Sequence, residues 1–347
     1  MRVLIDVLHP AHVHVFRNLR STLLDHGHEV LVTARDKEVV VELLERGGIE
    51  HHVLSTQATG SLALASELVR RTAKLARLAR SFRPDVMIGI MGPSIAPAGR
   101  MLRIPSVVFY DTELATVTNR WVYPLASAVC TPDSYAGTVR GNHVTYPSYH
   151  ELAYLHPDVF TPDPSRLQAY GLTRPFSLLR FVSWEASHDV GEVGLTLTDK
   201  VALVQRMESE GQVVISSEAP LPAELEPYRL HGPPGDIHHV LASATMVIGE
   251  SGTMSSEAAV LGTPAVMFAP RGAGVFDDQE RYGLLRRIRS YSVADALEAI
   301  DTVLADPDRL LEGRTRMLGD KISLTPWMTD FLLQRGWERS AAFSPDT

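Results

Sequence analysis

The sequence predicts an α/β protein made of two tandem doubly wound domains with a cleft between them. Three observations carry this prediction. Short apolar runs alternate with helical patterns along the chain, the alternation stops once in a Pro-rich stretch, and the length of 347 residues suits two domains of roughly 100–200 residues each. Strands this apolar are typical of parallel sheets that helices cover on both faces.

The first domain is expected over residues 1–150. Its strands are expected at residues 2–8, 29–33, 51–54, 85–90, 106–110 and 128–131. Its helices are expected at residues 13–26, 37–46, 62–82 and 94–102. Glycines such as Gly27 follow these helical patterns, as helix ends favour.

A linker is expected over residues 151–176, where prolines are frequent and periodic apolar positions are few. The second domain follows over residues 177–325. Its strands are expected at residues 177–182, 212–216, 245–248 and 265–268, and its helices at 195–210, 236–243, 253–261 and 293–304. The last segment, residues 326–347, is expected to pack back on the first domain as a helix.

Composition excludes several classes of protein. Hydrophobic residues make up 45% and charged residues 21%, so the chain is not disordered. The net charge of −8 argues against nucleic acid as a partner. The single cysteine, Cys130, excludes an internal disulfide and indicates a cytoplasmic protein. No apolar run approaches the roughly 18 residues of a spanning helix, and the N-terminal run is a strand rather than a signal peptide.

The strongest chemical signal lies in residues 244–268, ATMVIGESGTMSSEAAVLGTPAVMF. A buried strand ends at Gly249, a turn of small residues follows, and a helix begins near Thr253. Backbone N–H groups at such a helix start form an anion site suited to phosphate, with Ser251, Gly252, Thr253 and Met254 as nucleotide-binding residues. Glu257, one turn into the helix, can accept hydrogen bonds from a ribose diol. An ordinary capped helix with a surface glutamate remains the alternative.

This segment resembles the donor-nucleotide motif of GT-B proteins, in particular the non-hydrolysing UDP-N-acetylglucosamine 2-epimerase. Ser251, Gly252, Glu257 and the Leu-Gly-x-Pro at residues 261–264 match in step, whereas Thr253 replaces a glycine. The peptidoglycan N-acetylglucosaminyltransferase has a similar strand, turn and helix with its ribose-binding glutamate at this offset. The whole chain most resembles an uncharacterised prokaryotic family of unknown function grouped with these proteins. Its segments ELAYLHPDVFTPDP, LLRFVSWEASHDVG and GESGTMSSEAAVLGTP carry that likeness.

The resemblance implies the GT-B fold and a nucleotide-sugar ligand, but departures from the epimerase disfavour epimerisation. Pro93 stands where that family has an acidic residue, and the acidic residues expected just before Asn119-Arg120 are missing. Losing an acid–base group from a proton-abstraction site removes roughly 10²–10⁴ in rate. A glycosyl transferase needs only a bound leaving group, one base and neutralisation of the diphosphate.

The candidate base lies after the first strand, where GT-B proteins often carry a catalytic histidine. His12 is the first candidate, and Asp111 and Glu113 compete with it. The pattern His9-x-x-His12-x-His14 also suggests a metal site, but His14 is expected to point away from His9, so no metal is expected. The adjacent pairs at residues 51–52 and 238–239 are interpreted as structural, because neighbouring side chains diverge.

Further donor contacts are implied by the resemblance. Arg180 opens the second domain, where GT-B proteins bring a basic residue to the diphosphate, and its planar donors suit phosphate. A surface arginine is the alternative. Asp278-Gln279 resembles a pair that contacts donor-sugar hydroxyls in some transferases, and His188 is expected to line the same site.

The segment 62–83 carries six cationic residues against one glutamate, a local charge of +5. Such a helix can contact an anionic membrane surface or a lipid-linked acceptor, at the inner face of the membrane. An ordinary solvated amphipathic helix is the alternative.

These observations together predict a cytoplasmic, metal-independent glycosyltransferase-like enzyme. It is expected to use a UDP-linked nucleotide-sugar and to need no cofactor. A sugar-nucleotide epimerase or hydrolase and a non-catalytic nucleotide-sugar-binding protein are the alternatives. The sequence does not name the acceptor.

Overall fold

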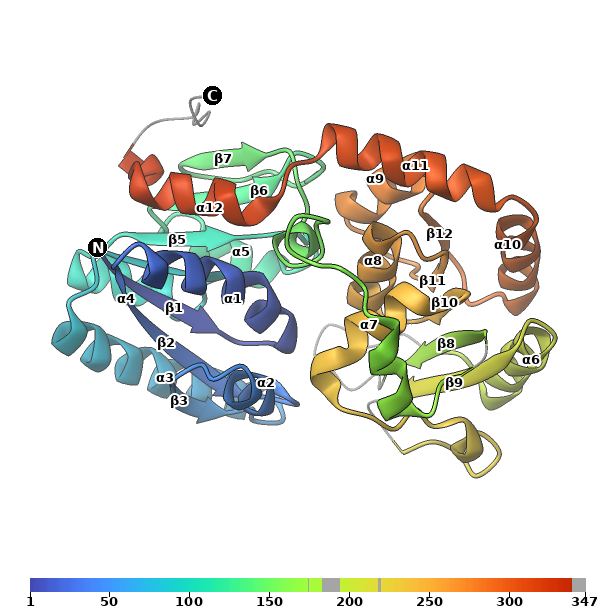
Figure 1. The fold of residues 1–347 in the computed structure, drawn as a ribbon. Helices are drawn as coiled ribbons and strands as arrows, with labels where there is room; N and C mark the ends of the chain where they lie inside the picture. Colours follow the sequence, from blue (N-terminus) through green and yellow to red (C-terminus); the bar gives the residue numbers. More distant parts are fainter. Residues whose placement is uncertain (174, 183–193, 218–219, 339–347) are drawn as a thin grey trace. The chain divides into compact units, whose positions relative to one another are not determined.

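The computed structural model describes residues 1–173, 175–182, 194–217 and 220–338. Two compact units share the chain. The first unit contains residues 1–154, 273–275 and 321–347, and the second contains residues 155–272 and 276–320. Each unit is an α/β structure with one parallel sheet (Figure 1). The predicted fold class, with two doubly wound sheets in tandem, is confirmed.

The first unit has a seven-stranded sheet with the order β3-β2-β1-β4-β5-β6-β7, in which every neighbouring pair is parallel. The strands are β1 (Arg2–Val7), β2 (Glu29–Asp36), β3 (His51–Thr56), β4 (Val86–Ile90), β5 (Ser106–Phe109), β6 (Ala128–Pro132) and β7 (His143–Tyr146). Strands β1, β4, β5 and β6 are almost completely buried, which explains their continuous apolar sequences.

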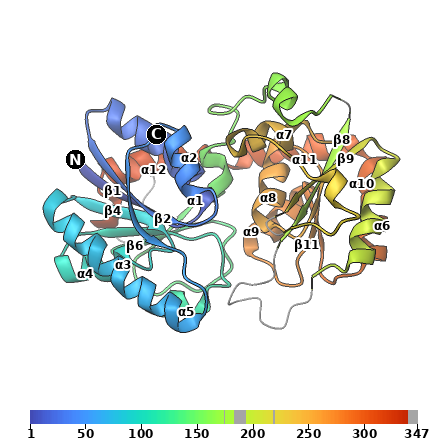
Figure 2. The ribbon, with the colours of Figure 1, turned by 90° about the horizontal axis from the view of Figure 1, so that it is seen from below.

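Helices cover both faces of this sheet, with α1, α2 and α12 on one side and α3, α4 and α5 on the other (Figure 2). They are α1 (Pro10–Asp25), α2 (Val40–Arg46), α3 (Ser61–Phe82), α4 (Ile95–Leu102), α5 (Thr116–Val122) and α12 (Leu324–Leu333), with short 3-10 helices at His150–Ala153 and Gly336–Glu338. Helix α12 packs beside α1, and its Trp327 and Phe331 are buried. The ring of Trp327 lies 5.0 Å from that of Tyr146.

The second unit has a five-stranded parallel sheet with the order β12-β11-β10-β8-β9. The strands are β8 (Phe176–Phe181), β9 (Gln212–Ser217), β10 (Met246–Gly249), β11 (Ala265–Phe268) and β12 (Leu285–Ile288). The helices are α6 (Leu197–Glu208), α7 (Ile237–Ser243), α8 (Gly252–Leu261), α9 (Gly274–Tyr282), α10 (Val293–Ala305) and α11 (Pro307–Asp320), with 3-10 helices at Pro164–Tyr170, Glu226–Tyr228 and Pro234–Asp236. The chain moves outward from β8 to β9 and then returns to β10 on the other side of β8, so the strand order reverses between β8 and β10.

The Pro-rich segment is more ordered than a linker. It contains two 3-10 helices, and the rings of Tyr154 and Tyr170 are buried together with Leu155 and Leu172. The fixed φ of proline suits the first turn of a short helix, as at Pro164. In the described ranges, no helix has the length and hydropathy needed to cross a membrane.

Candidate functional site

The carboxyl ends of β8 and β10 meet at the strand-order reversal of the second unit. Ligands of open parallel sheets bind at such points. Gly249 ends β10 and pairs in register with Arg180 of β8. A Cβ atom on Gly249 would lie 2.0 Å from the carbonyl oxygen of Arg180, so only glycine allows this approach. The glycine therefore keeps the end of the strand close to Arg180.

Helix α8 begins at Gly252, one residue before the start that the sequence predicts. Ser251 is the N-cap residue, and its Oγ accepts the N–H of Met254 at 3.4 Å. The N–H groups of Gly252 and Thr253 have no acceptor within the helix, because they lie in its first turn. Gly252 also lets the ring of Phe276 approach, since a Cβ atom there would lie 2.8 Å from it.

Glu257 is buried rather than exposed on the helix surface. Its exposed fraction is 4%, and its Oε1 lies 3.0 Å from Nε2 of His238 on α7. His238 is itself buried. The sequence interpretation of His238 as merely structural missed this pairing, because residues 238 and 257 belong to two different helices.

Arg180 is half-buried at the end of β8. Its Nη1 donates a hydrogen bond to Oγ of Ser216 on β9 at 3.0 Å, which fixes the side chain. The neighbouring Glu250 acts on the backbone: its carboxylate accepts the N–H groups of Leu195 at 2.9 Å and Val182 at 3.3 Å. The acidic residue after the strand therefore binds the backbone at two described positions, Val182 and Leu195.

The predicted sugar-binding residues have different surroundings. Gln279 is fully buried, and its Nε2 donates to Oγ of Ser256 at 2.7 Å. Its contact with a donor sugar stays a prediction. Asp278 is largely buried and forms an ion pair with Arg281. His188 lies outside the described residues.

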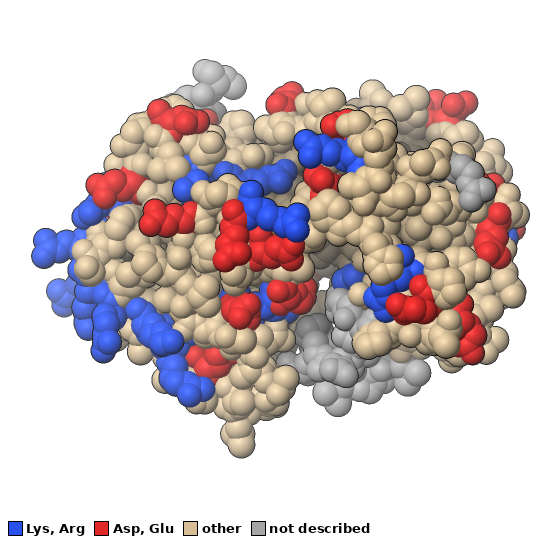
Figure 3. All heavy atoms as spheres, turned by 60° about the horizontal axis from the view of Figure 1, so that its bottom comes forward, with Lys and Arg blue, Asp and Glu red and all other residues tan. Residues whose placement is uncertain are grey.

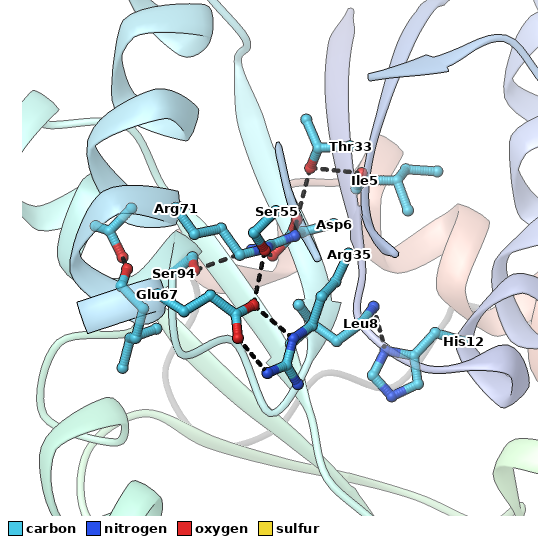
Figure 4. Close-up of polar contacts among 12 residues, drawn as sticks. Ile5, Asp6, Leu8, His12, Thr33, Arg35, Ser55, Glu67, Arg71 and Ser94 are labelled. Carbon is cyan, nitrogen blue, oxygen red and sulfur yellow. Dashed lines mark hydrogen bonds and ion pairs between the residues drawn. The ribbon is translucent and has the colours of Figure 1, made fainter. Parts of the chain in front are cut away.

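In the first unit, the strand order reverses between β1 and β4, and His12 follows the carboxyl end of β1. The N–H of Leu8 donates to Nδ1 of His12 at 3.2 Å (Figure 4). Burial, followed by the nearby His9, holds the pKa of His12 well below its usual value, so the ring is neutral at pH 7. Because Nδ1 accepts a hydrogen bond, the proton belongs on Nε2. His12 is therefore arranged as a hydrogen-bond donor, which favours Asp111 over His12 as the candidate base.

Asp111 follows β5 and forms an ion pair with His150, with 3.0 Å between its Oδ2 and Nδ1 of the imidazole. Burial opposes the charge on both groups, yet their mutual attraction lowers the pKa of Asp111 and raises that of His150. The Asp111 side chain is 37% exposed, so an ionised carboxylate oriented by a buried histidine remains accessible. The sequence analysis missed His150, although it directly precedes a segment that carries the family likeness.

Glu113 has a different role from Asp111. Its Oε1 accepts the N–H of Ala136 at 2.7 Å, and both oxygens lie 3.2–3.3 Å from the N–H of Gly274, a residue of the same unit. These contacts engage the carboxylate with the backbone, so Asp111 is the better candidate for proton transfer.

A buried ionic network links β1, β2 and α3 of the first unit (Figure 4). Arg71 of α3 donates to both carboxylate oxygens of Asp6 at 2.5 and 2.9 Å and to Oγ of Ser94. Thr33 donates to Asp6 at 2.6 Å. Arg71 and Asp6 have exposed fractions of 2% and 0%. Of the six cationic residues counted in the segment 62–83, Arg71 is buried and neutralises the aspartate near the carboxyl end of β1.

The other basic residues of α3 are exposed, and Figure 3 shows Lys and Arg side chains gathered over this part of the first unit. The exposed set comprises Arg70, Lys74, Arg77, Arg80 and Arg83, with Arg100 and Arg103 on and after the adjacent α4. Large apolar side chains lie among them, since Leu62, Val69 and Met101 are exposed. We call this set the α3–α4 surface.

The two units thus offer different chemistry. The second unit presents backbone N–H groups and an arginine, which suit an anion. The first presents an accessible carboxylate paired with a buried histidine, which suits proton transfer. In the described part of the chain, no group of three His, Cys, Asp or Glu side chains is arranged to hold a metal ion.

Comparison with known proteins agrees with this architecture. Residues 1–138 match the family model described as "Protein of unknown function (DUF354)". The UDP-N-acetylglucosamine--N-acetylmuramyl-(pentapeptide) pyrophosphoryl-undecaprenol N-acetylglucosamine transferase of Stutzerimonas stutzeri is 28% identical over 137 residues, which cover 36% of this chain and only 38% of that protein. The transferase of the same name from Bordetella parapertussis is 27% identical over 277 residues, 75% of this chain and 74% of that protein.

Solved structures extend the likeness to the whole chain. A putative UDP-N-acetylglucosamine 2-epimerase from Listeria monocytogenes has a TM-score of 0.70 at 12% identity, covering 98% of this chain and 97% of that one. A spinosyn forosaminyltransferase has a TM-score of 0.63 at 15% identity, covering 98% of this chain and 100% of that one. At these identities the likeness concerns the fold. The chain is therefore a GT-B-fold protein whose first 138 residues match the DUF354 family, as the sequence resemblance predicted.

Proposed function

We propose that this protein is a metal-independent glycosyltransferase-like enzyme that takes its sugar from a UDP-linked nucleotide-sugar. The observation that carries the proposal is the turn between β10 and α8. There the N–H groups of Gly252 and Thr253 follow a central strand, and Arg180 lies on the adjacent one. A diphosphate needs both features: N–H donors at a helix start and a cation for its remaining charge.

In this proposal Ser251, Gly252, Thr253 and Met254 surround the diphosphate, and Arg180 neutralises it. Glu257 binds the ribose, and His238 orients its carboxylate. Solved structures of similar fold carry such ligands, including a UDP-N-acetylglucosamine 2-epimerase from Neisseria meningitidis bound to UDP-GlcNAc, with a TM-score of 0.64.

In the proposed transfer step, a residue of the first unit accepts the proton of the acceptor hydroxyl. Asp111 accepts the proton of the acceptor hydroxyl as its oxygen attacks the anomeric carbon of the sugar. The bond from that carbon to the diphosphate breaks, and UDP leaves with the bonding electron pair. His12 donates a hydrogen bond through Nε2, and His150 keeps Asp111 ionised and oriented.

Titration calorimetry with UDP tests the nucleotide site. Glu257→Gln is expected to weaken UDP binding by about tenfold or more, since a hydrogen bond to a charged group contributes roughly 1.5–3 kcal/mol. Glu298→Gln on the exposed side of α10 is the matched control and is expected to bind UDP like the wild type. EDTA is expected to leave UDP binding unchanged. Equal UDP affinity of the Glu257→Gln and wild-type proteins would contradict the assignment of Glu257 as the ribose-binding residue.

Incubation with UDP-sugars in the absence of acceptor separates the alternatives. An isomerised sugar identifies an epimerase, and free UDP identifies a hydrolase. Binding without turnover across a panel of acceptors identifies a binding protein. A transferase releases UDP only when an acceptor is added, and Asp111→Asn is expected to reduce that rate by roughly 10²-fold or more.

We also propose that the α3–α4 surface contacts an anionic membrane that carries a lipid-linked acceptor. The support is the combination of exposed arginines with exposed Leu62 and Val69, as surface-binding helices show. Flotation with anionic liposomes at low salt is expected to carry the protein upward, and Arg70→Gln with Arg77→Gln is expected to reduce this. Arg166→Gln, an exposed arginine of the second unit, is the control. Absence of flotation at low salt contradicts the proposal.

A further inference from the structure

A pocket of about 730 Å³ lies in the first unit, at the carboxyl ends of β5 and β6. We call it the tyrosine–arginine pocket. Its lining comes from the loop after β5, from α5 and from the loop between β6 and β7: Glu113, Thr116, Asn119, Arg120, Tyr123, Tyr135, Gly137, Thr138 and Arg140. Glu113 is the one predicted site residue in this lining. The volume lies in the range of roughly 300–1,000 Å³ that is usual for small-molecule sites.

Two arginines give the pocket a positive character. Arg120 and Arg140 are exposed, and within the described residues neither forms an ion pair or a hydrogen bond. The only carboxylate in the lining, that of Glu113, is already engaged by the N–H groups of Ala136 and Gly274. Two guanidinium groups from separate segments of the chain can therefore converge on an external anion.

The remainder of the lining fits an organic molecule better than a bare ion. Tyr123 and Tyr135 share a hydrogen bond of 2.6 Å between their hydroxyl oxygens, and burial raises the pKa of each, so both rings stay neutral. The Oδ1 of Asn119 is buried and has no hydrogen-bond partner in the described part of the chain. A buried acceptor without a donor is costly, and a ligand hydroxyl would satisfy it.

We propose that the tyrosine–arginine pocket binds a phosphorylated small molecule, with its phosphate on Arg120 and Arg140 and a hydroxyl group donating to Asn119. A phosphate monoester carries close to two negative charges at neutral pH, and its oxygens match the planar fork of each guanidinium. A carboxylate would use only one of the two cations. Binding here does not depend on a nucleotide in the second unit.

Titration calorimetry with glucose 1-phosphate is the direct test. The wild-type protein is expected to bind it saturably, and Arg120→Gln and Arg140→Gln are each expected to weaken binding about tenfold or more. Arg166→Gln, an exposed arginine of the second unit, is the matched control and is expected to bind like the wild type. Because both pocket arginines are exposed, the variants are expected to keep the wild-type thermal midpoint.

Asn119→Leu separates the hydroxyl contact from the phosphate contact. This variant is expected to weaken glucose 1-phosphate binding while leaving inorganic phosphate binding unchanged. Geranyl phosphate, a short prenyl phosphate, serves as a second probe to distinguish a lipid-borne phosphate from a soluble sugar phosphate. Binding of either probe that depends on Arg120 and Arg140 supports the proposed phosphate site. The probe that binds identifies whether the phosphate group comes from a soluble sugar or from a lipid. If neither probe binds, or if both bind equally to Arg120→Gln and Arg140→Gln, the proposal is overturned.

Discussion

The carboxyl edges of the two sheets use different chemical groups. In the first unit, titratable side chains stand at the strand ends: His12 after β1, Asp111 after β5 and His150 after β7. In the second unit, the corresponding edge offers backbone N–H groups of α8 and a guanidinium from β8. In the proposed function, one fold principle supports two tasks, with proton transfer at one edge and anion binding at the other.

The supports beneath these edges differ as well. The first unit carries the buried Asp6–Arg71 ion pair, which joins β1 to α3. The second unit relies on the close approach of Gly249 to Arg180 and on Glu250, which holds neighbouring backbone N–H groups. The first edge depends on electrostatic balance, and the second on backbone geometry.

The largest effect is expected from breaking the ionic support of the first unit. Arg71→Met leaves Asp6 charged and buried without its partner, and the free energy of unfolding is expected to fall by about 3–5 kcal/mol. Urea denaturation measures this change. Arg77→Met on the exposed side of the same helix is expected to change stability by about 0.5 kcal/mol or less. Asp6→Val combined with Arg71→Met is expected to recover much of the loss, and a double variant as unstable as Arg71→Met contradicts the role of the ion pair.

A methyl group at the end of β10 tests the geometric support of the second unit. Gly249→Ala places a Cβ atom 2.0 Å from the carbonyl oxygen of Arg180, and we expect a loss of about 3 kcal/mol because β8 and β10 must separate. Gly319→Ala in α11 is the control, since nothing lies within 4 Å of its Cβ position. Removing a helical glycine should stabilise the protein by about 0.5–1 kcal/mol. A Gly249→Ala protein as stable as the wild type would show that the close approach is dispensable.

A comparison of two N-cap serines in the second unit separates an effect on stability from an effect on UDP binding. Ser251→Ala and Ser292→Ala each remove an N-cap hydroxyl, from α8 and α10, and each is expected to cost about 1 kcal/mol. Only Ser251→Ala is expected to weaken UDP binding as well, which calorimetry would measure. If both variants bind UDP like the wild type, the start of α8 is not the diphosphate site.

The smallest expected effect is a pH dependence of the stability of the fold, which has opposite signs for His150 and His12. The raised pKa of His150 means that its ion pair stabilises the fold below pH 6.5 and is lost as the pH rises through the folded pKa. The lowered pKa of Asp111 means that this stabilisation is fully present above about pH 3.8 and is lost as the pH falls through the lower folded pKa. Because Asp111 is 37% exposed, water screens the pair, and the effect is expected to be on the order of 0.5–1 kcal/mol.

His12 behaves in the other direction. Its pKa is lowered, so the unfolded chain takes up a proton below pH 6.5 more readily than the folded protein, and stability falls with decreasing pH. Denaturation midpoints are therefore to be measured between pH 4 and 8. Relative to the wild type, His150→Gln is expected to be least stable near pH 5, whereas the stability of His12→Gln is expected to increase there. Parallel profiles for the two variants would contradict the assigned protonation states.

Much of the fold was predictable because its strands are buried on both faces. Continuous apolar runs revealed β1, β4, β8 and β10, and glycines marked the ends of several helices. Elements with mixed patterns were missed: β12 contains two arginines and β7 is a short strand at the edge of the sheet. Helices α9 and α11 are rich in charged residues, which weakens the periodic apolar signal.

The site was predictable where it is local in sequence. Ser251, Gly252 and the start of α8 lie within a few residues of one another, so spacing alone indicated the turn. Pairings across the fold were not predictable in this way. Asp111 meets His150, Glu257 meets His238, and Asp6 meets Arg71 only after the sheet and its helices have formed. Sequence patterns also did not reveal that Glu113 and Gln279 are engaged inside the protein.

The return of α12 to the first unit has a consequence for biosynthesis. Trp327 and Phe331 complete the packing around Tyr146, although more than half of the chain separates them from most of that unit. A ribosome therefore releases the first sheet long before its last covering helix emerges. The growing polypeptide must keep this apolar surface unpaired, or shielded by a chaperone, until α12 has been translated.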